Sequence, residues 1–322
     1  MSLVYNDKPG VNIETRKRIG DLLKENGYKI HDSSQVIPTI KRTIIFARYK
    51  GSGHLFEAVD DFFSKVFDGI DLGIKRLGYN LNITNISEYD LPDFIHSVDP
   101  NDVDGIIFLA SEYDPAKSNI LQSAKVPVVL LDSRITSFPI NTIAVENLNS
   151  VYQALQHLVS LGHTKIGYLC SNELTGAIPE RQAAFTQITN ALGIAISPSD
   201  ILSLPIFVDE CYHRCLQAFQ QNRQLPTAFF ADNDIIATGA LRAFSELNIH
   251  VPEDVSVIGF DDSLVCTLFS PALTTMRIPK QELGYLSVMR LHEIIEGDSV
   301  IRISMVPAEL VLRASTAPPR TY

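Results

Sequence analysis

The sequence contains no long apolar segment and no targeting signal. Crossing a bilayer as a helix takes about 18 or more consecutive apolar residues, and each apolar stretch in these 322 residues is interrupted earlier by a charge, Gly or Pro. The first residues also lack an apolar segment followed by a small-residue cleavage site. These absences exclude a membrane-spanning protein and indicate a cytoplasmic one, unless a leader was removed before residue 1.

Cysteine is scarce, and its spacing does not indicate a metal site. Four cysteines in 322 residues are too few for a disulfide scaffold and fit a reducing compartment. Cys211 and Cys215 could share one helix face, but His213 would point away from it, and no second ligand pair follows. We expect packed thiols rather than a zinc site, and the sequence implies neither a metal nor a cofactor.

The motifs of the common enzyme classes are missing as well. The sequence has no G-x-S-x-G nucleophile elbow, no P-loop lysine and no H-E-x-x-H zinc motif. The glycines of residues 51–53 are not followed by the third glycine of a dinucleotide-binding loop. We therefore expect a protein that is not an enzyme.

Charge is distributed unevenly along the chain. The 27 Lys+Arg against 37 Asp+Glu give a net charge of −10, which argues against nucleic acid as a partner. Residues 1–42 nevertheless hold eight basic and five acidic side chains, a net charge of +3, so the remainder carries −13. This asymmetry suggests a basic arm that addresses a polyanion and an acidic body that does not, although a solvated helix with scattered charge would show the same counts.

From residue 43 onward, short apolar runs alternate with longer amphipathic segments. Such alternation is typical of parallel sheets covered by helices on both faces, and the pattern restarts near residue 142. The expected strands are residues 43–48, 79–84, 103–109, 126–131, 142–145, 165–170, 201–204, 227–231, 255–260, 274–278 and 303–312, and the expected helices are residues 58–77, 91–97, 115–123, 147–161, 179–192, 210–222, 234–247 and 280–295. The sequence thus predicts an α/β fold of two doubly wound parallel-sheet lobes.

The end of the chain is expected to link the two lobes. One helix and one strand after residue 277 are too little for a third domain, so we expect them to complete the two sheets by crossing back. The first lobe would then be residues 43–144 plus 277–302, and the second residues 145–276 plus 303–322. Ligands of such folds usually bind in the crevice at the carboxyl ends of the strands, and several crossings favour hinge closure around a small ligand.

The basic arm carries a motif of DNA-binding proteins. Residues 6–11 form an expected turn, Asn12 can cap a helix over residues 14–25, and Gly27 would end it. The run 4–28, VYNDKPGVNIETRKRIGDLLKENGY, closely resembles part of the headpiece of bacterial repressors of the lactose repressor/galactose repressor (LacI/GalR) family. The similar part comprises the end of the recognition helix, the wing turn and the third helix.

The resemblance to this family extends over the whole body. The matching segments are residues 61–63 (DFF), 102–107 (DVDGII), 126–132 (VPVVLLD), 157–167 (HLVSLGHTKIG), 232–240 (DNDIIATGA) and 251–262 (VPEDVSVIGFDD). On these motifs the chain is identified as a member of the LacI/GalR family.

The resemblance implies a transcriptional repressor whose core is like a type I periplasmic binding protein. Residues 1–30 would be a partial helix-turn-helix headpiece and residues 31–42 the hinge. A homodimer is expected, because the operators of such proteins mirror the two-fold axis of the protein. Effector binding would shift the closure of the lobes and thereby the affinity for operator DNA; whether the effector releases or recruits the repressor stays open.

The arm departs from the family pattern in two places. The opening helix and most of the recognition helix are absent, so the sequence looks truncated and we expect weak operator binding or none, with Tyr5, Asn6 and Lys8 as DNA contacts. In the hinge, Ile37 falls where the family inserts a leucine wedge between base pairs, but Pro38 would end a helix there. Ile37 is either a minor-groove wedge or part of a disordered linker.

A third departure lies at the mouth of the expected crevice. The segment 49–61 is longer than is usual in the family and contains Gly51, Gly53 and His54. It could act as a lid or reshape the pocket, so the effector classes of the family do not transfer directly.

Six side chains are expected to bind the effector, because they match family motifs: Phe62, Phe63, Asp132, Arg181, Asn233 and Asp261. The two aromatic rings would form walls that suit sugar rings or flat bases. Asp132 would accept a hydroxyl or amine unless it only caps a turn, and Arg181 would donate two parallel hydrogen bonds unless it forms a surface ion pair. Asn233 and Asp261 would point into the crevice from strand ends.

Residues beside these leave choices open. Asp234 is expected to cap the following helix. Of Asp261 and Asp262, one carboxylate would face the ligand and the other a helix terminus, and either Ile206 or Phe207 would supply a further apolar wall.

The expected set of groups is most consistent with a sugar or a sugar derivative as the effector. A solute-binding receptor of a sugar transporter shares the two-lobe core, but it would carry a signal peptide in place of the arm motif. A sugar-modifying enzyme using Asp132 and Asp261 is a third interpretation, against which the missing motifs count.

Overall fold

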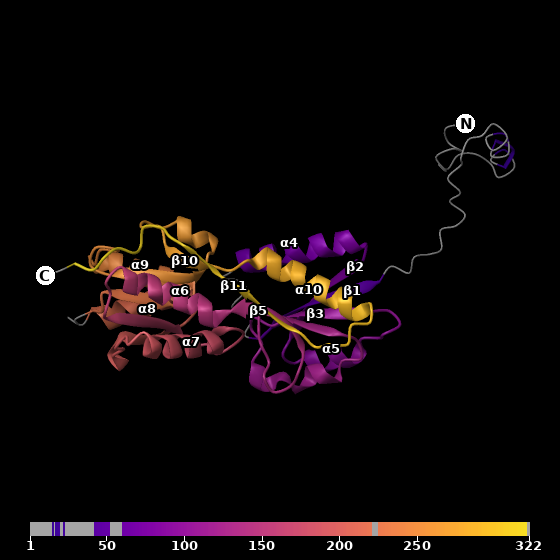
Figure 1. The fold of residues 1–322 in the computed structure, drawn as a ribbon, viewed down its shortest axis with the longest axis horizontal. Coiled ribbons are helices and arrows are strands. Elements are labelled where there is room, and N and C mark those ends of the chain that lie inside the picture. Colours follow the sequence, from indigo (N-terminus) through magenta and orange to yellow (C-terminus); the bar gives the residue numbers. More distant parts are fainter. Residues whose placement is uncertain are drawn as a thin grey trace. The chain divides into compact units, whose positions relative to one another are not determined.

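The computed structural model describes residues 15, 17–19, 22, 42–51, 60–220 and 225–320. The chain divides into two compact units, Met1–Lys41 and Arg42–Tyr322. In the first unit only the helical residues 15, 17–19 and 22 are described. The expectations for Tyr5, Asn6, Lys8 and Ile37 therefore lie outside the described residues, as does most of the expected lid. Within the second unit the chain forms two α/β lobes (Figure 1).

The first lobe is a six-stranded parallel sheet with helices on both faces. Its strand order is β11-β5-β4-β3-β1-β2, and every neighbouring pair is parallel. The strands are β1 (Thr43–Lys50), β2 (Asn80–Ser87), β3 (Gly105–Leu109), β4 (Val128–Leu131), β5 (Asn141–Glu146) and β11 (Ile303–Pro307), and the helices are α4 (Asp60–Leu77), α5 (Leu91–Ser97), the 3-10 helix η2 (Pro115–Ser123) and α10 (Lys280–Ile295). Because side chains alternate between the faces of a strand, Phe46 packs toward α4 and α10 and Ala47 toward α5.

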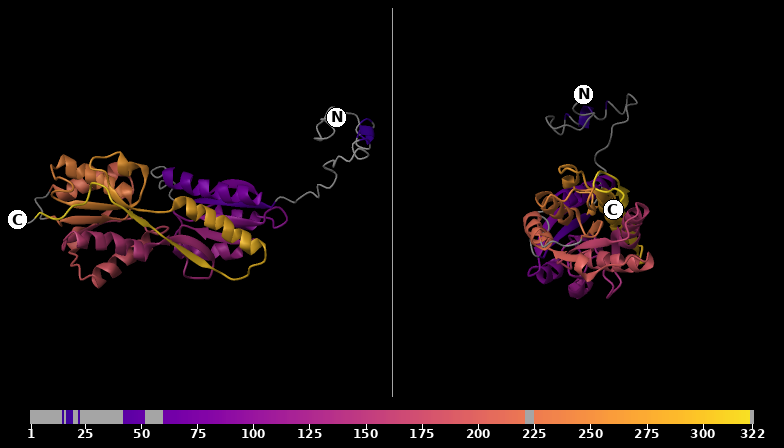
Figure 2. Two further views of the ribbon diagram at one scale, coloured as in Figure 1. Left: turned by 45° about the horizontal axis from the view of Figure 1, so that its top comes forward. Right: turned by 90° about the vertical axis from the view of Figure 1, so that its left-hand side faces the viewer.

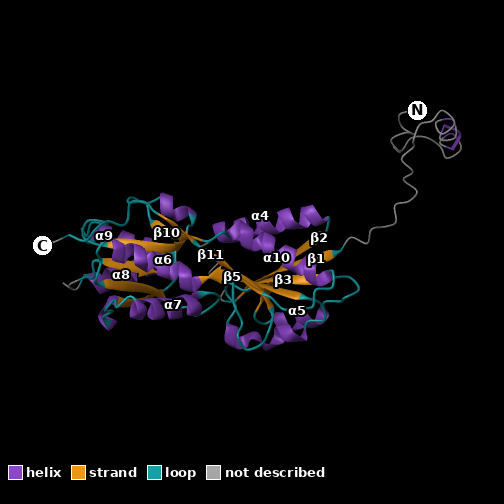
Figure 3. Ribbon diagram, in the orientation of Figure 1, coloured by secondary structure: helices purple, strands orange, loops and turns teal. Residues whose placement is uncertain are grey.

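The second lobe repeats this architecture (Figure 3). Its strand order is β12-β10-β9-β8-β6-β7, and only β12 is antiparallel to its neighbour in this sheet. The strands are β6 (Ile166–Ser171), β7 (Ile201–Leu204), β8 (Ala228–Ala231), β9 (Ser256–Asp261), β10 (Thr274–Arg277) and β12 (Glu309–Val311), and the helices are α6 (Asn147–Ser160), α7 (Ile178–Ala191), α8 (Val208–Phe219), α9 (Asp234–Glu246) and the 3-10 helices η3 (Pro198–Asp200) and η4 (Leu264–Thr267). The predicted fold class, two doubly wound lobes of mainly parallel sheet, is confirmed.

Three chain segments cross between the lobes. They are the step from β5 to α6, the step from β10 to α10, and the step from β11 to β12. Figure 2 shows the last part of the chain, in yellow, running from α10 along the first lobe and on to the second. The crossings form the hinge of the two-lobe body.

The prediction that residues 303–322 belong wholly to the second lobe is wrong for β11. This strand pairs with β5 of the first sheet, with Ile303 opposite Thr142 and Met305 opposite Ala144. The continuous run 303–312 predicted one strand, but the chain leaves the first sheet at Ala308, whose N–H donates to Ser150 Oγ at 3.2 Å. The crossing therefore lies inside the predicted strand.

Two glycines allow α4 and α10 to pack at very short range. A Cβ on Gly69 would lie 1.8 Å from the backbone oxygen of Gln281, and a Cβ on Gly284 would lie 2.0 Å from that of Val66. The contact ties the returning helix α10 to the first helix of the lobe. None of the helices in the described part of the chain has the length and apolar character needed to cross a bilayer.

Candidate functional site

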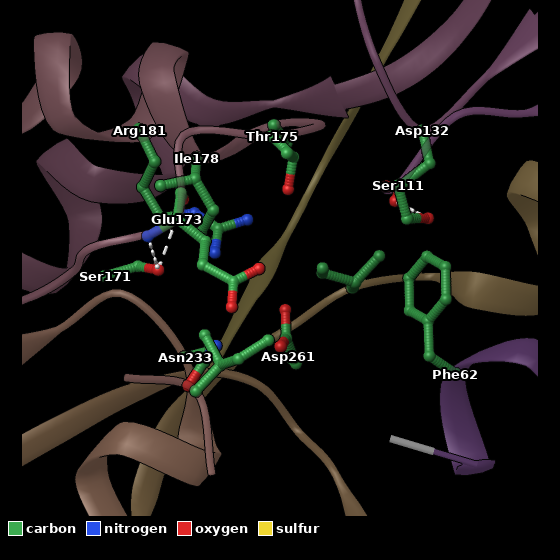
Figure 4. A pocket seen from close by; sticks show the side chains of 13 residues that line it. Phe62, Ser111, Asp132, Ser171, Glu173, Thr175, Ile178, Arg181, Asn233 and Asp261 are labelled. Atoms are coloured by element: carbon green, nitrogen blue, oxygen red, sulfur yellow. Dashed lines mark hydrogen bonds between the residues drawn. The ribbon is translucent and has the colours of Figure 1, made fainter. Parts of the chain in front are cut away.

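A pocket lies between the two lobes, at the carboxyl ends of their strands (Figure 4). The first lobe contributes residues that follow β3 and β4 and the first turns of α4, and the second contributes the β6–α7 loop, the start of α7 and the ends of β8 and β9. The lining residues are Phe62, Ser111, Asp132, Ser171, Glu173, Thr175, Ala177, Ile178, Arg181, Ile206, Asn233, Asp261 and Ile278. Parallel sheets of both lobes thus present their ligand-binding edge to one cavity.

Five of the six predicted effector residues line this pocket, and Phe63 does not. The ring of Phe63 stacks on Phe46 with a centroid distance of 5.7 Å, and the guanidinium carbon of Arg48 lies 4.3 Å from its centroid. Successive residues of a helix point about 100° apart, so only Phe62 of the pair faces the cavity. The prediction of two aromatic walls is therefore wrong for Phe63.

Asp132 directly follows β4, and its buried carboxylate faces the pocket. Its backbone is left-handed, with φ of 68°, and its side chain is 7% exposed. Ser111 Oγ donates to Asp132 Oδ2 at 2.5 Å. Burial raises the pKa of Asp132 to about 6, although this hydrogen bond and the charge of Arg181 oppose the shift. Ser111 was not predicted as a site residue. It follows the fully buried strand β3, and a polar residue after a buried strand is the same signal that indicated Asp132.

Asp261 ends β9 and faces the pocket from the second lobe. Its φ of 112° is unusual for a residue other than glycine. Burial raises its pKa to about 7; Arg181 and Lys280 lower it, and Asp234 and Asp132 raise it further. None of the described residues donates a hydrogen bond to the Asp261 carboxylate, so this group is available to a ligand.

Arg181 is a buried pocket residue, 3% exposed, and not part of a surface ion pair. Its Nε donates to Asn147 Oδ1 at 3.2 Å, and its Nη1 donates to the backbone oxygen of Asp232. The guanidinium carbon lies 3.6 Å from the ring centroid of Phe260, a cation–π arrangement. Figure 4 shows the guanidinium group directed toward the cavity, so its remaining terminal nitrogen is the part that can reach a ligand.

Asn233, not Asp234, caps helix α9. The Asn233 Oδ1 accepts the N–H of Ile236 at 2.8 Å, which leaves the amide NH₂ to donate into the pocket. Asp234 instead accepts hydrogen bonds from the Ser263 N–H at 2.7 Å and from Thr275 Oγ1 at 2.5 Å. The expected capping role of Asp234 is therefore wrong, because both residue types cap helices and only the backbone geometry selects one.

Asp261 and Asp262 diverge, as expected, but Asp262 does not face a helix terminus. Its carboxylate pairs with Arg277 at 2.7 Å and with Arg313 at 2.5 Å. These two ion pairs hold the pKa of Asp262 below its usual value against the effect of burial. The adjacent carboxylates therefore do not form an acid/base pair.

The β6–α7 loop supplies pocket residues that the sequence reading missed. Thr175 Oγ1 is buried and has no hydrogen-bond partner in the part of the chain that the structure describes. Glu173 and Ser171 also line the cavity, and Figure 4 shows the Glu173 carboxylate turned toward it. Ile206, one of two residues considered as an apolar wall, lines the pocket, whereas Phe207 starts helix α8 as its N-cap.

Contacts at the rim hold the two lobes together. The Gly176 N–H donates to the Tyr113 backbone oxygen at 3.1 Å, and Ser133 Oγ donates to the Gly176 backbone oxygen at 3.4 Å. Arg134 and Glu180 form an ion pair at 2.7 Å. The structure therefore has the crevice in a closed arrangement.

The predicted thiol pair lies away from this site. Cys211 and Cys215 are buried on α8 with their sulfur atoms 4.0 Å apart, and His213 lies on the exposed side. Within residues 42–51, 60–220 and 225–320 no cluster of three His, Cys, Asp or Glu side chains could hold a metal ion.

Comparisons with known proteins agree with this two-lobe architecture. Residues 155–316 match the family of periplasmic binding protein-like domains. The HTH-type transcriptional repressor PurR of Haemophilus influenzae (strain PittEE) is 29% identical over 264 residues, covering 79% of this chain and 77% of the relative.

Two solved structures share this fold. The lac repressor dimer bound to operator and the anti-inducer ONPF superimposes with a TM-score of 0.75 at 24% identity, covering 98% of this chain and 94% of that one. The complex of the transcriptional regulator CelR with cellobiose gives a TM-score of 0.74 at 22% identity, with the same coverage of 98% and 94%. The chain therefore belongs to the family of periplasmic binding protein-like domains, and its sequence is similar to HTH-type transcriptional repressors.

Proposed function

We propose that this chain is the effector-binding core of a DNA-binding repressor that responds to a sugar or a sugar derivative. The observation that carries the proposal is one pocket to which both lobes contribute a carboxylate, the buried Asp132 from the first and the partly buried Asp261 from the second. A ligand that bonds to both carboxylates stabilises the closed arrangement of the lobes, because it contacts both only when they are close.

The chemistry of the lining favours a polyhydroxylated ligand. The carboxylates accept hydrogen bonds from hydroxyl groups, and Asn233 and Arg181 can each donate one. Phe62 offers one apolar ring face, against which the C–H face of a sugar ring packs. The sugar bound in the CelR complex, cellobiose, is of this chemical class.

Closure of the lobes couples effector binding to DNA binding. Because three segments cross between the lobes, closing them around a ligand rotates one lobe relative to the other as a unit. In a homodimer this rotation changes the spacing of two DNA-reading arms, and operator affinity changes with it. We propose a homodimer on operator DNA in the cytoplasm, as for the lac repressor dimer, and binding of the effector without chemical conversion.

The proposal is tested by ligand binding followed by DNA binding. Thermal-shift screening with mono- and oligosaccharides and nucleobases identifies a ligand, and Arg181→Ala and Asp261→Ala are each expected to abolish its effect. Because the chain itself is expected to bind operator weakly or not at all, a chimera that places the complete headpiece of the lac repressor before residue 31 then reports affinity for the lac operator by fluorescence anisotropy, with and without that ligand. A ligand that changes operator affinity at least tenfold supports the proposal, whereas retained ligand binding in both variants, or operator affinity indifferent to the ligand, contradicts it.

A further inference from the structure

We infer that the crevice selects its effector by charge: it accepts uncharged and amine-bearing polyols and rejects phosphorylated and carboxylated ones. The inference rests on the proposed function, because it concerns the same pocket, and it narrows the class of effector. Three features of the site carry it: the placement of its carboxylates, the hydrogen bonds that its one guanidinium group already makes, and the capping of the two second-lobe helices that begin at the pocket.

The carboxylates stand on both sides of the ligand space. Asp132 comes from the first lobe and Asp261 from the second, and both line the one cavity. Asp132 accepts a hydrogen bond from Ser111 only, and Asp261 accepts none from the described residues. The charge of Asp132 raises the pKa of Asp261 across the crevice, so a further negative charge between the two carboxylates is unfavourable. An anionic ligand would add to this repulsion on closing.

Arg181 is the only guanidinium among the pocket-lining residues that the structure describes, and most of it is already used. Its Nε donates to Asn147 and its Nη1 to the backbone of Asp232, and Phe260 covers one face of the group at 3.6 Å. Its charge is also the strongest influence that favours ionisation of Asp261. A phosphate group normally needs two parallel N–H donors and a surplus of positive charge, and Arg181 supplies neither here.

The helix termini that the second lobe places at the pocket do not replace this missing charge. A helix N-terminus binds anions through its free N–H groups and its dipole, and α7 and α9 both begin at the cavity. In α7, however, the Ile178 N–H donates to the Thr175 backbone oxygen at 3.1 Å, Pro179 has no N–H, and Glu180 places a carboxylate in the first turn.

The N–H groups and the dipole at the start of helix α9 are compensated in the same way. Asn233 Oδ1 takes the N–H of Ile236 at 2.8 Å, and the buried Asp234 stands in the first turn. Both helix starts are thus neutralised by their own side chains or backbone. What the pocket offers instead is hydrogen-bond acceptors, two carboxylates and the unpartnered Thr175 hydroxyl, which call for a ligand rich in O–H or N–H donors.

The test compares matched derivatives of one ring. Glucose, galactose, mannose and ribose are each titrated as the parent sugar, as the amino sugar where it exists, as the terminal phosphate and as the uronic acid, by calorimetry at pH 8 and low salt. For every ring that binds, we expect the amino form to bind at least as tightly as the parent, and the phosphate and uronic acid at least tenfold more weakly.

Two variants assign the selectivity to the pocket. Asp261→Asn removes one charge at the site. We expect the ratio of the affinity for the amino form to the affinity for the phosphate to fall at least tenfold in this variant. Asp209→Asn removes an equal charge from an exposed residue of the same lobe, paired with Arg242, and we expect it to behave like the wild type. The wild-type titrations decide the question even if Asp261→Asn folds poorly.

The outcomes separate this inference from the proposed function. A phosphate or uronic acid that binds the wild type as tightly as its parent overturns the charge selection, and so does a panel in which only anionic members bind. A ligand that obeys the selection but leaves operator affinity unchanged contradicts the proposed function and leaves the selection standing.

Discussion

Gly176 of the second lobe lies directly against the backbone of Ser111 of the first. A Cβ on Gly176 would be 2.2 Å from the Ser111 backbone oxygen, closer than any carbon can approach it, and Gly176 also has a left-handed φ of 55°. The residue therefore marks the point where the two lobes touch at the rim, next to the hydroxyl that holds Asp132. Its lack of a side chain is a condition for the closed crevice.

We expect Gly176→Ala to hold the lobes apart. The methyl group cannot fit in the closed arrangement, so affinity for the effector should fall at least tenfold, about 1.4 kcal/mol, and the radius of gyration with ligand, measured by small-angle scattering, should stay at the value without ligand. Gly193→Ala is the matched control, because Gly193 has a similar φ of 66° but open space around its Cβ. Equal losses of affinity in both variants would show that backbone strain, not the lobe contact, causes the effect.

Stability should decrease as pH rises through neutrality, because of Asp261. Burial raises its pKa from 3.8 to about 7, so between these values the folded chain binds a proton that the unfolded chain has released, and the free energy of unfolding falls with increasing pH. Asp261→Asn has no carboxyl group to ionise at this position, so its free energy of unfolding should exceed that of the wild type by about 1–3 kcal/mol at pH 8. This difference in the free energy of unfolding should be smaller at pH 5.

Urea unfolding at several pH values measures this difference. Asp132, with a pKa raised to about 6, leaves part of the slope in place in the Asp261→Asn variant. Asp209→Asn, at an exposed position, should follow the wild-type curve. If the Asp261→Asn and wild-type curves stay parallel from pH 5 to pH 8, Asp261 does not titrate as inferred.

Arg181→Lys should be costly even though it preserves the charge. An ammonium group cannot reproduce the contacts with Asn147 and Asp232 or stack on Phe260, and it leaves buried acceptors unsatisfied. We expect a loss of about 2–4 kcal/mol in the free energy of unfolding, measured by urea titration. Arg242→Lys is the control at an exposed arginine that also lies over a ring, that of Tyr212, and it should cost under about 1 kcal/mol; similar losses for both would argue against the special position of Arg181.

The contact between α4 and α10 should tolerate an added methyl group at Gly73 better than one at Gly69. Gly69→Ala places a methyl group 1.8 Å from a backbone oxygen, whereas Gly73→Ala meets the side chain of Val288 at 2.8 Å, which can shift. We expect losses of about 3 kcal/mol or more for Gly69→Ala and about 1 kcal/mol for Gly73→Ala, read from thermal or urea unfolding. The reverse order would mean that the helices are not packed backbone to backbone.

The sequence was most informative where polar residues follow buried strands. Asp132 directly follows an apolar strand and Asp261 ends a mainly apolar one, and in a parallel sheet all such ends lie at one edge, so their meeting in one pocket could be expected. Phe63 was misplaced because a helix start one residue earlier or later turns the ring by about 100°. The register of a helix start depends on its packing against the sheet, which local sequence does not specify.

Loop residues and strand ends were harder to predict for a different reason. Thr175 reaches the pocket only because the β6–α7 loop folds back at Gly176 against the other lobe, a contact between residues far apart in the sequence. The split of residues 303–312 into β11 and β12 has a similar cause, since both halves are apolar and only the positions of β5 and β10 decide where each pairs. Long-range pairing, not propensity, fixes these features.

The position of β11 also affects how the protein is made. In the first sheet this edge strand neighbours β5, Asn141–Glu146, yet it consists of residues 303–307, and β12 of the second sheet follows at residues 309–311. During synthesis neither sheet can be completed until the last residues have left the ribosome, although domains usually fold in order from the N-terminus. Both lobes therefore mature together, and a nascent chain stopped before residue 303 would expose the unpaired edge of β5 to any strand nearby.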